Sequence, residues 1–114
     1  MKRAFAILAV AVLVAGIFAV SGSAGDATKG KVIYTRSCLK CHAADGSGQP
    51  AIAKALKVEM KALGSEEVQK LTDEQIKKDI VEGTGKMQKV AGLSDQDVAD
   101  VIAYVRTFAK KAAK

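Results

Sequence analysis

The stretch Cys38-Leu39-Lys40-Cys41-His42 decides how the rest of this sequence is interpreted. It contains the only two cysteines and the only histidine of the 114-residue chain. Two thiols at this spacing can each form a thioether with one vinyl group of a single porphyrin, and the imidazole that follows can bind the iron from one side. The C-x-x-C-H pattern therefore predicts one covalently attached c-type haem, held by Cys38, Cys41 and His42.

The start of the chain has the features of an export signal. Residues 1–3 are a short basic segment, residues 4–20 are an uninterrupted apolar run, and small residues lead up to Ala24. This order is typical of a signal peptide, so we expect residues 1–24 to be removed and a periplasmic domain to span 25–114. The alternative is a membrane anchor formed by residues 4–20, because this run reaches the short end of the roughly 17–25 residues of a spanning helix.

The expected mature domain is small and moderately basic. A chain of this size makes one domain with a marginal core, and a covalent haem would add a large apolar body to it. The precursor carries a net charge of +6, and removing Lys2 and Arg3 leaves 16 basic and 12 acidic side chains, a net charge of +4. A basic surface favours acidic partners. No run of basic residues indicates nucleic-acid binding.

Hydrophobic spacing and capping residues predict an all-α domain without strands. A first helix is expected over 26–41 with Asp26 as its N-cap, followed by a partly helical stretch over 51–63. A Thr72–Gln75 capping box starts another helix, which a glycine ends. Ser94 caps the last helix. The apolar positions of this last helix are Val98, Val101, Ile102, Val105 and Phe108.

The second axial ligand of the iron has several candidates, because the chain has no second histidine. They are Met87, Met60, a lysine or an open site. Met87 stands in a glycine-bearing loop over 84–92 that can bend a side chain across the haem. Met60 keeps the helical spacing of the 51–63 stretch, as a packed core residue would. We favour Met87, although gap-filling in a core is the usual role of methionine.

Several segments, taken in order, resemble the class I monohaem cytochromes c of bacteria. The matching segments within residues 26–109 are Lys29-Gly30-Lys31 through Tyr34, Cys38 to His42 with Ala44-Asp45-Gly46, Gly83-x-Gly85-Lys86-Met87, Gly92-Leu93-Ser94-Asp95, and Val98 through Tyr104-Val105-Arg106. The resemblance implies a class I cytochrome c-like fold, with three to five helices around one covalent haem. It implies thioether bonds at Cys38 and Cys41. It also implies His42 as the proximal and Met87 as the distal ligand.

The resemblance further implies that the first and last helices cross, with Gly30 beneath Tyr104. Two positions depart from the family pattern. Gln88 follows Met87 where many relatives have a proline, so the ligand loop loses a rigid residue. Lys54 stands where relatives often have a proline whose carbonyl accepts a hydrogen bond from the proximal histidine. A lysine keeps that carbonyl, so the hydrogen bond can survive.

The resemblance implies a one-electron carrier. We expect no catalytic residues, no enzyme activity and no small-molecule substrate. Partners would be redox proteins with acidic docking surfaces, and the protein would be a monomer. Lys40, Lys86 and Lys89 flank the motif and the ligand loop, where they can steer such partners. Exposed charges equally often do no more than solvate a surface.

Other interpretations of the motif stay open. A thioredoxin-like thiol pair needs a βαβ pattern, which the sequence lacks. A zinc site would have three of the usual four ligands, and a structural disulfide is the simplest use of an exported cysteine pair. A haem with a displaceable distal ligand could act as a ligand sensor or a weak peroxidase, although peroxidase chemistry wants a distal acid–base group.

Overall fold

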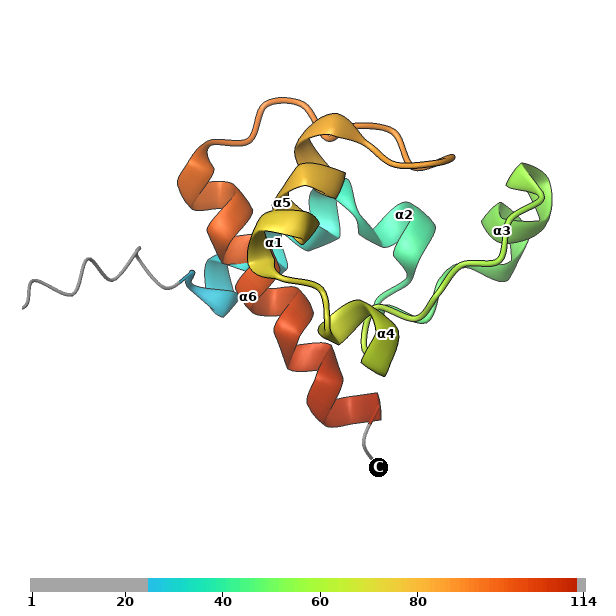
Figure 1. Cartoon of the computed structure of the whole chain (residues 1–114), viewed down its shortest axis with the longest axis horizontal. Coiled ribbons are helices and arrows are strands. Elements are labelled where there is room, and N and C mark those ends of the chain that lie inside the picture. Colours follow the sequence, from blue (N-terminus) through green and yellow to red (C-terminus); the bar gives the residue numbers. More distant parts are fainter. Residues whose placement is uncertain (1–24, 113–114) are drawn as a thin grey trace, which may run out of the picture.

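The computed structural model describes residues 25–112, with side chains described up to residue 109. Six helices and no strand are present in this part of the chain (Figure 1). They are α1 (Ala27–Ser37), α2 (Leu39–His42), α3 (Pro50–Leu56), α4 (Glu66–Gln69), α5 (Asp73–Glu82) and α6 (Asp95–Ala112). The expectation of an all-α domain is confirmed. The predicted signal peptide or anchor, residues 1–24, lies outside the described residues.

Helices α1 and α6 cross in close contact at Gly30. A Cβ built on Gly30 would lie 1.9 Å from the carbonyl oxygen of Asp100 and 3.0 Å from the Cβ of Tyr104. Only glycine therefore lets the two backbones approach this closely. The N-cap of α1 is tied to the same place, because the backbone N–H of Asp26 donates to Oδ1 of Asp100 at 2.8 Å. The expected crossing, with Gly30 beneath Tyr104, is confirmed.

Three aromatic rings fill the angle between α1 and α6. Tyr34, Tyr104 and Phe108 pack edge to face, with ring centroids between 5.1 and 5.3 Å apart. The aliphatic side chains buried around them are Ile33, Ile76, Ile80, Val98, Val101, Ile102 and Val105. This core confirms the apolar face predicted for the last helix, and it brings α5 against α6.

Polar contacts fasten α4 and α5 to α6. The predicted Thr72–Gln75 capping box begins α5. From α6, the Arg106 guanidinium donates to the backbone carbonyls of Gln69 and Leu71 at 2.9 and 2.7 Å. It also donates to the Asp73 carboxylate at 2.6 Å. One side chain thus fixes the turn between α4 and α5 against the last helix.

The first helix is not continuous over 26–41 as predicted. It is interrupted at Cys38, where α1 ends and α2 begins as a separate turn that extends through His42. The hydrogen-bond pattern starts afresh there, because the N–H groups of Cys41 and His42 both donate to the Cys38 carbonyl, at 3.2 and 2.9 Å. The break places the motif on a single turn of helix at the end of α1.

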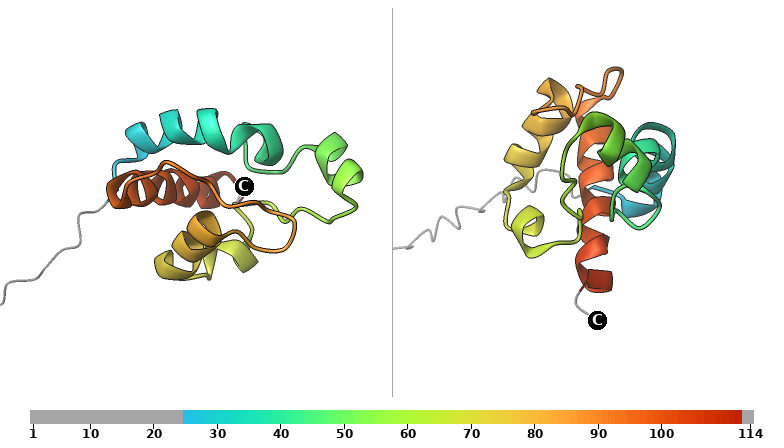
Figure 2. Two further views of the ribbon diagram at one scale, coloured as in Figure 1. Left: turned by 90° about the horizontal axis from the view of Figure 1, so that it is seen from above. Right: turned by 90° about the vertical axis from the view of Figure 1, so that its right-hand side faces the viewer.

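The stretch 51–63 is helical only in its first half. Helix α3 ends at Leu56 because Lys57 adopts a left-handed conformation with φ 54°. Figure 2 shows α3 standing apart from α1, α5 and α6. The single-turn α4, capped by the Ser65 side chain, was not predicted. Because the predicted first helix is split into α1 and α2 and α4 is added, the described residues form six helices instead of the expected three to five.

Candidate functional site

The two cysteines lie at the end of α1. Cys38 caps both α1 and α2, and Cys41 lies within α2. Both side chains are half-buried free thiols. Burial, together with the nearby Cys41, raises the pKa of Cys38 to about 11, so this thiol is protonated at neutral pH. A reduced, partly accessible thiol pair is the state from which thioether bonds to a porphyrin form.

The His42 imidazole is half-buried, and its Nδ1 is enclosed without a hydrogen-bond partner. Burial lowers the pKa of the ring, which favours the neutral form that binds metals. The Lys54 carbonyl does not accept from Nδ1 in this structure and instead accepts from the Lys57 N–H at 3.2 Å. A buried ring nitrogen without a partner is uncommon for a purely structural histidine. It points to a binding role for this ring.

The backbone around His42 is held on two sides. N–H groups of the loop 46–49 donate to the carbonyls of Cys41 and His42 at 2.9 and 2.8 Å. From α1, the Tyr34 hydroxyl donates to the Ala43 carbonyl at 2.5 Å. Sequence analysis missed this last contact, because nothing in the local pattern links a tyrosine to a residue nine positions later. The motif is therefore positioned by the core as well as by its own loop.

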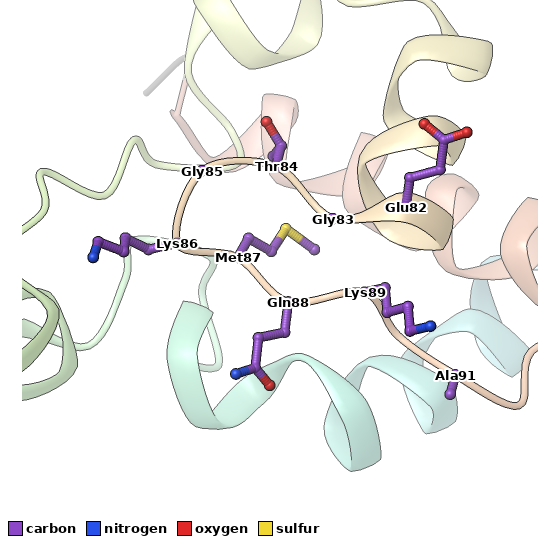
Figure 3. A pocket seen from close by; sticks show the side chains of 9 residues that line it. All are labelled: Glu82, Gly83, Thr84, Gly85, Lys86, Met87, Gln88, Lys89 and Ala91. Atoms are coloured by element: carbon purple, nitrogen blue, oxygen red, sulfur yellow. The ribbon is translucent and has the colours of Figure 1, made fainter.

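Met87 follows a tight turn after α5. Thr84 and Met87 exchange two backbone hydrogen bonds at 3.0 and 2.9 Å, closing a two-residue hairpin in which Gly85 has φ 54°. Gly83 lets the loop fold back, since a Cβ there would lie 2.8 Å from the Met87 carbonyl oxygen. Figure 3 shows the Met87 side chain between the two arms of this loop. It is half-buried and packs against the edge of the core.

Met60 does not occupy the helical position that its spacing suggested. It lies in the non-helical segment after α3, because the helix has already ended at Leu56. Its side chain is half-buried and lies against Gly48, so that a Cβ on Gly48 would be 3.0 Å from the Met60 Cβ and 3.4 Å from its sulfur. Met60 therefore packs on the loop that hydrogen-bonds to the His42 carbonyl.

This arrangement has close parallels among known proteins. The sequence model of the family described as Cytochrome c matches residues 27–109. The chain belongs to the cytochrome c family. It is 32% identical over 103 residues to cytochrome c-554(547) of Halothiobacillus neapolitanus, a match that covers 75% of this chain and 99% of that protein.

A solved structure shows the same fold. This cytochrome superposes on the KustC0563 c-type cytochrome with a TM-score of 0.59 and 29% sequence identity, covering 69% of this chain and 95% of that one. Together with the family match, this likeness confirms a small monohaem, class I-like cytochrome c.

Membership of the family gives the cofactor and the coarse function. The cytochrome carries a covalently bound haem c with its iron, and its function is haem-based electron transfer. The free thiol pair and the enclosed His42 ring, whose pKa is lowered by burial, fit that group. Within residues 25–112, no three histidine, cysteine or acidic side chains gather as a metal-binding cluster, so the zinc alternative has no support there. The two thiols are not joined, so the structure holds no disulfide either.

The three lysines that flank the site are all exposed. Lys40 lies on α2 between the two cysteines. Figure 3 shows Lys86 and Lys89 pointing outward from opposite ends of the Met87 loop. None of the three forms an ion pair with another described residue. Among the described helices, none is long and apolar enough to cross a membrane.

Proposed function

We propose that this cytochrome is a one-electron carrier whose haem iron is held between His42 and Met87, and that it passes electrons between periplasmic or membrane-bound redox proteins. The haem supplies an iron that alternates between ferrous and ferric states. The chain supplies the thioether bonds through Cys38 and Cys41, the iron ligands and a docking surface. The observation that carries the proposal is the half-buried His42, whose Nδ1 is enclosed without a hydrogen-bond partner, directly after two free thiols. We also propose that the protein is not an enzyme.

The choice of Met87 as distal ligand rests on its turn. A hairpin closed by two hydrogen bonds presents one methionine at a defined position, whereas Met60 is already packed against Gly48. A neutral, soft thioether favours ferrous iron and raises the reduction potential. Gln88, in place of a proline, leaves the turn less rigid, so we expect the iron–sulfur bond to be more easily displaced than in relatives that have the proline.

The distal ligand is tested by comparing Met87→Ala with Met60→Ala. Ferric haem with a methionine ligand has a weak far-red absorption band. Met87→Ala should abolish this band, lower the reduction potential and open the iron to added imidazole. Met60→Ala should keep the band and lower the free energy of unfolding by about 1 to 2 kcal/mol, because the side chain is only half-buried.

Two results would contradict the assignment. If the two variants exchange phenotypes, Met60 is the distal ligand. If the unmodified protein shows no band, the iron has another sixth ligand or none, and the ligand-sensor interpretation gains ground over a carrier with histidine and methionine ligands.

Covalent attachment and export are tested by intact mass. The secreted protein should have the mass of residues 25–114 plus one haem, because we propose that residues 1–24 are a cleaved signal peptide. Extraction with acidic organic solvent should leave the haem on the chain. A bare-polypeptide mass contradicts the attachment, and a full-length mass in the membrane fraction contradicts the cleavage.

We also propose that Lys40, Lys86 and Lys89 steer partners with acidic surfaces. All three are exposed and unpaired within the described residues, so their charges remain available to a partner. Charge steering weakens with salt because the Debye length is about 10 Å at 0.1 M. Changing all three to glutamine should flatten the salt dependence of the bimolecular electron-transfer rate.

A matched control for this docking test comes from α4, α5 and the turn between them. Lys70, Lys77 and Lys78 pair with acidic neighbours there, and changing them to glutamine removes the same total charge away from the motif. The control should keep the salt slope of the unmodified protein. If both triple variants flatten the slope equally, net charge rather than these three positions governs the encounter. If both keep the slope of the unmodified protein, Lys40, Lys86 and Lys89 only solvate the surface.

A further inference from the structure

The residue directly after His42 has a strained backbone. Ala43 has φ 65° and ψ 167°, a region that essentially only glycine occupies without cost. The other described non-glycine residue with positive φ is Lys57. Lys57 lies in the left-handed region that commonly ends a helix. Ala43 is therefore the unusual case, and something must hold it there.

The Tyr34 hydroxyl contacts Ala43 from the folded core. It donates to the Ala43 carbonyl oxygen at 2.5 Å, while the Gly46 N–H donates to the same oxygen at 3.2 Å. Tyr34 is 1% exposed, and its ring is locked between Tyr104 and Phe108. Burial raises the pKa of Tyr34, so the hydroxyl keeps its proton and stays a donor. A rigid aromatic cluster thus pins one peptide group.

This contact differs from those of the two preceding carbonyls. Cys41 and His42 accept from backbone N–H groups of the loop 46–49, which follows the motif in the chain. Ala43 also accepts from a side chain on α1, which is fixed by the crossing with α6. The hydroxyl is therefore a direct link between the folded core and the carbonyl of Ala43, the residue that follows His42.

We propose that Tyr34 is a positioning residue, whose hydroxyl holds Ala43 in its strained conformation and so sets the orientation of His42 toward the haem iron. The proposal rests on the proposed ligation of iron by His42. A phenylalanine at this position would fill the same space but could not hold the carbonyl. The distinction therefore lies in one hydroxyl group.

The first test compares Tyr34→Phe with Tyr104→Phe in the haem-loaded protein. Tyr104→Phe removes a hydroxyl from the same aromatic cluster and leaves the Tyr34–Ala43 hydrogen bond in place. Tyr34→Phe should shift the reduction potential and the paramagnetically shifted proton resonances of the His42 ring, and Tyr104→Phe should leave both unchanged. Equal shifts for the two variants would overturn the proposal.

The second test relieves the strain with Ala43→Gly. Glycine adopts this conformation without help, so this variant should make the unfolding equilibrium constant roughly threefold to tenfold smaller. In the Ala43→Gly background, Tyr34→Phe should lose most of its effect on the His42 resonances and on the potential. If the effect of Tyr34→Phe is the same in both backgrounds, the hydroxyl does not act through Ala43.

The outcomes separate this inference from the proposed function. If Tyr34→Phe does not mature, Ala43→Gly should restore the yield of haem-loaded protein, and a failure to do so overturns the proposal. The unfolding equilibria of the four proteins test the Tyr34–Ala43 link without reference to the iron. If those equilibria are coupled while the His42 resonances of the unmodified protein show no paramagnetic shift, the ligation by His42 is wrong and the positioning role falls with it.

Discussion

Two parts of the domain are built by different means. One is the crossing of α1 and α6, and the other consists of the segments 43–64 and 83–93, which we call the flanking segments. At the crossing, the core side chains of α1, α5 and α6 are at most 7% exposed, and Tyr34, Val98, Val101 and Phe108 are each 1% exposed. In residues 43–64 and 83–93, Gly46 is the one buried residue. Figures 1 and 2 show α3, within the first of these segments, well away from the core.

The difference shows which part of the domain folds through its own side chains. The crossing has a complete core, a glycine contact and two capped helices. The flanking segments depend on turns with positive φ, and their apolar side chains, such as Met60 and Met87, are half-buried. A haem c bound beside the motif would bury these side chains further, because its porphyrin is a large apolar surface against which they can pack. We therefore expect stability to depend chiefly on the crossing, and redox properties on the flanking segments.

The largest loss of stability is expected from Phe108→Ala. This ring is 1% exposed and packs edge to face with two tyrosines, so its removal should lower the free energy of unfolding by about 3 to 5 kcal/mol. Leu56→Ala, at a residue on α3 that is 39% exposed, should cost less than about 1 kcal/mol. Urea unfolding of the haem-loaded protein measures both. Equal losses would mean that α3 belongs to the same packed core and would break the comparison.

A somewhat smaller loss is expected from Gly30→Ala. The new Cβ would lie 1.9 Å from the Asp100 carbonyl oxygen, so α1 and α6 must separate, at a cost of about 3 kcal/mol. Gly85→Ala is the control in the Met87 hairpin, where a Cβ meets nothing within 4 Å but φ is 54°. It should cost only about 1 kcal/mol. Thermal unfolding measures the two, and a control that costs as much as Gly30→Ala would contradict the role of the close crossing.

The smallest effect is a change in pH dependence at Asp100. This buried carboxylate accepts hydrogen bonds from the Asp26 N–H and the Gln96 side chain, which hold its pKa below the ordinary value of 3.8. The Asp100 carboxylate therefore binds a proton more tightly in the unfolded chain than in the folded protein. Asp100 therefore stabilises the fold fully above pH 3.8, and this contribution is lost as the pH falls below 3.8 toward the folded pKa.

Asp100→Asn should accordingly flatten the loss of stability in acid. Urea unfolding between about pH 6 and pH 3 measures the slope. Glu74→Gln removes an exposed carboxylate from α5 and serves as the control for the change in charge. If both variants keep the slope of the unmodified protein, Asp100 does not contribute to the acid sensitivity of the crossing.

The sequence alone determined the features that depend on near neighbours in the chain. The C-x-x-C-H spacing indicated the covalent haem, and the Asp26 cap, the Thr72–Gln75 capping box and the Ser94 cap marked three helix starts, each of which the structure confirms. The apolar repeat of the last helix predicted its buried face. Such patterns are readable because helical hydrogen bonds and caps join residues three or four positions apart.

Only the tertiary structure decided the contacts that join distant parts of the chain. The Tyr34 hydroxyl reaches Ala43, and Arg106 reaches carbonyls some 35 residues earlier. The sequence predicted a partly helical stretch over 51–63, but only the structure shows that the helix ends at Leu56 and that the chain turns at Lys57. Spacing along a sequence cannot specify these features, because each depends on where another element brings its donors and acceptors. The orientation of the motif thus depends on the folded core, whereas its chemistry was already present in five consecutive residues.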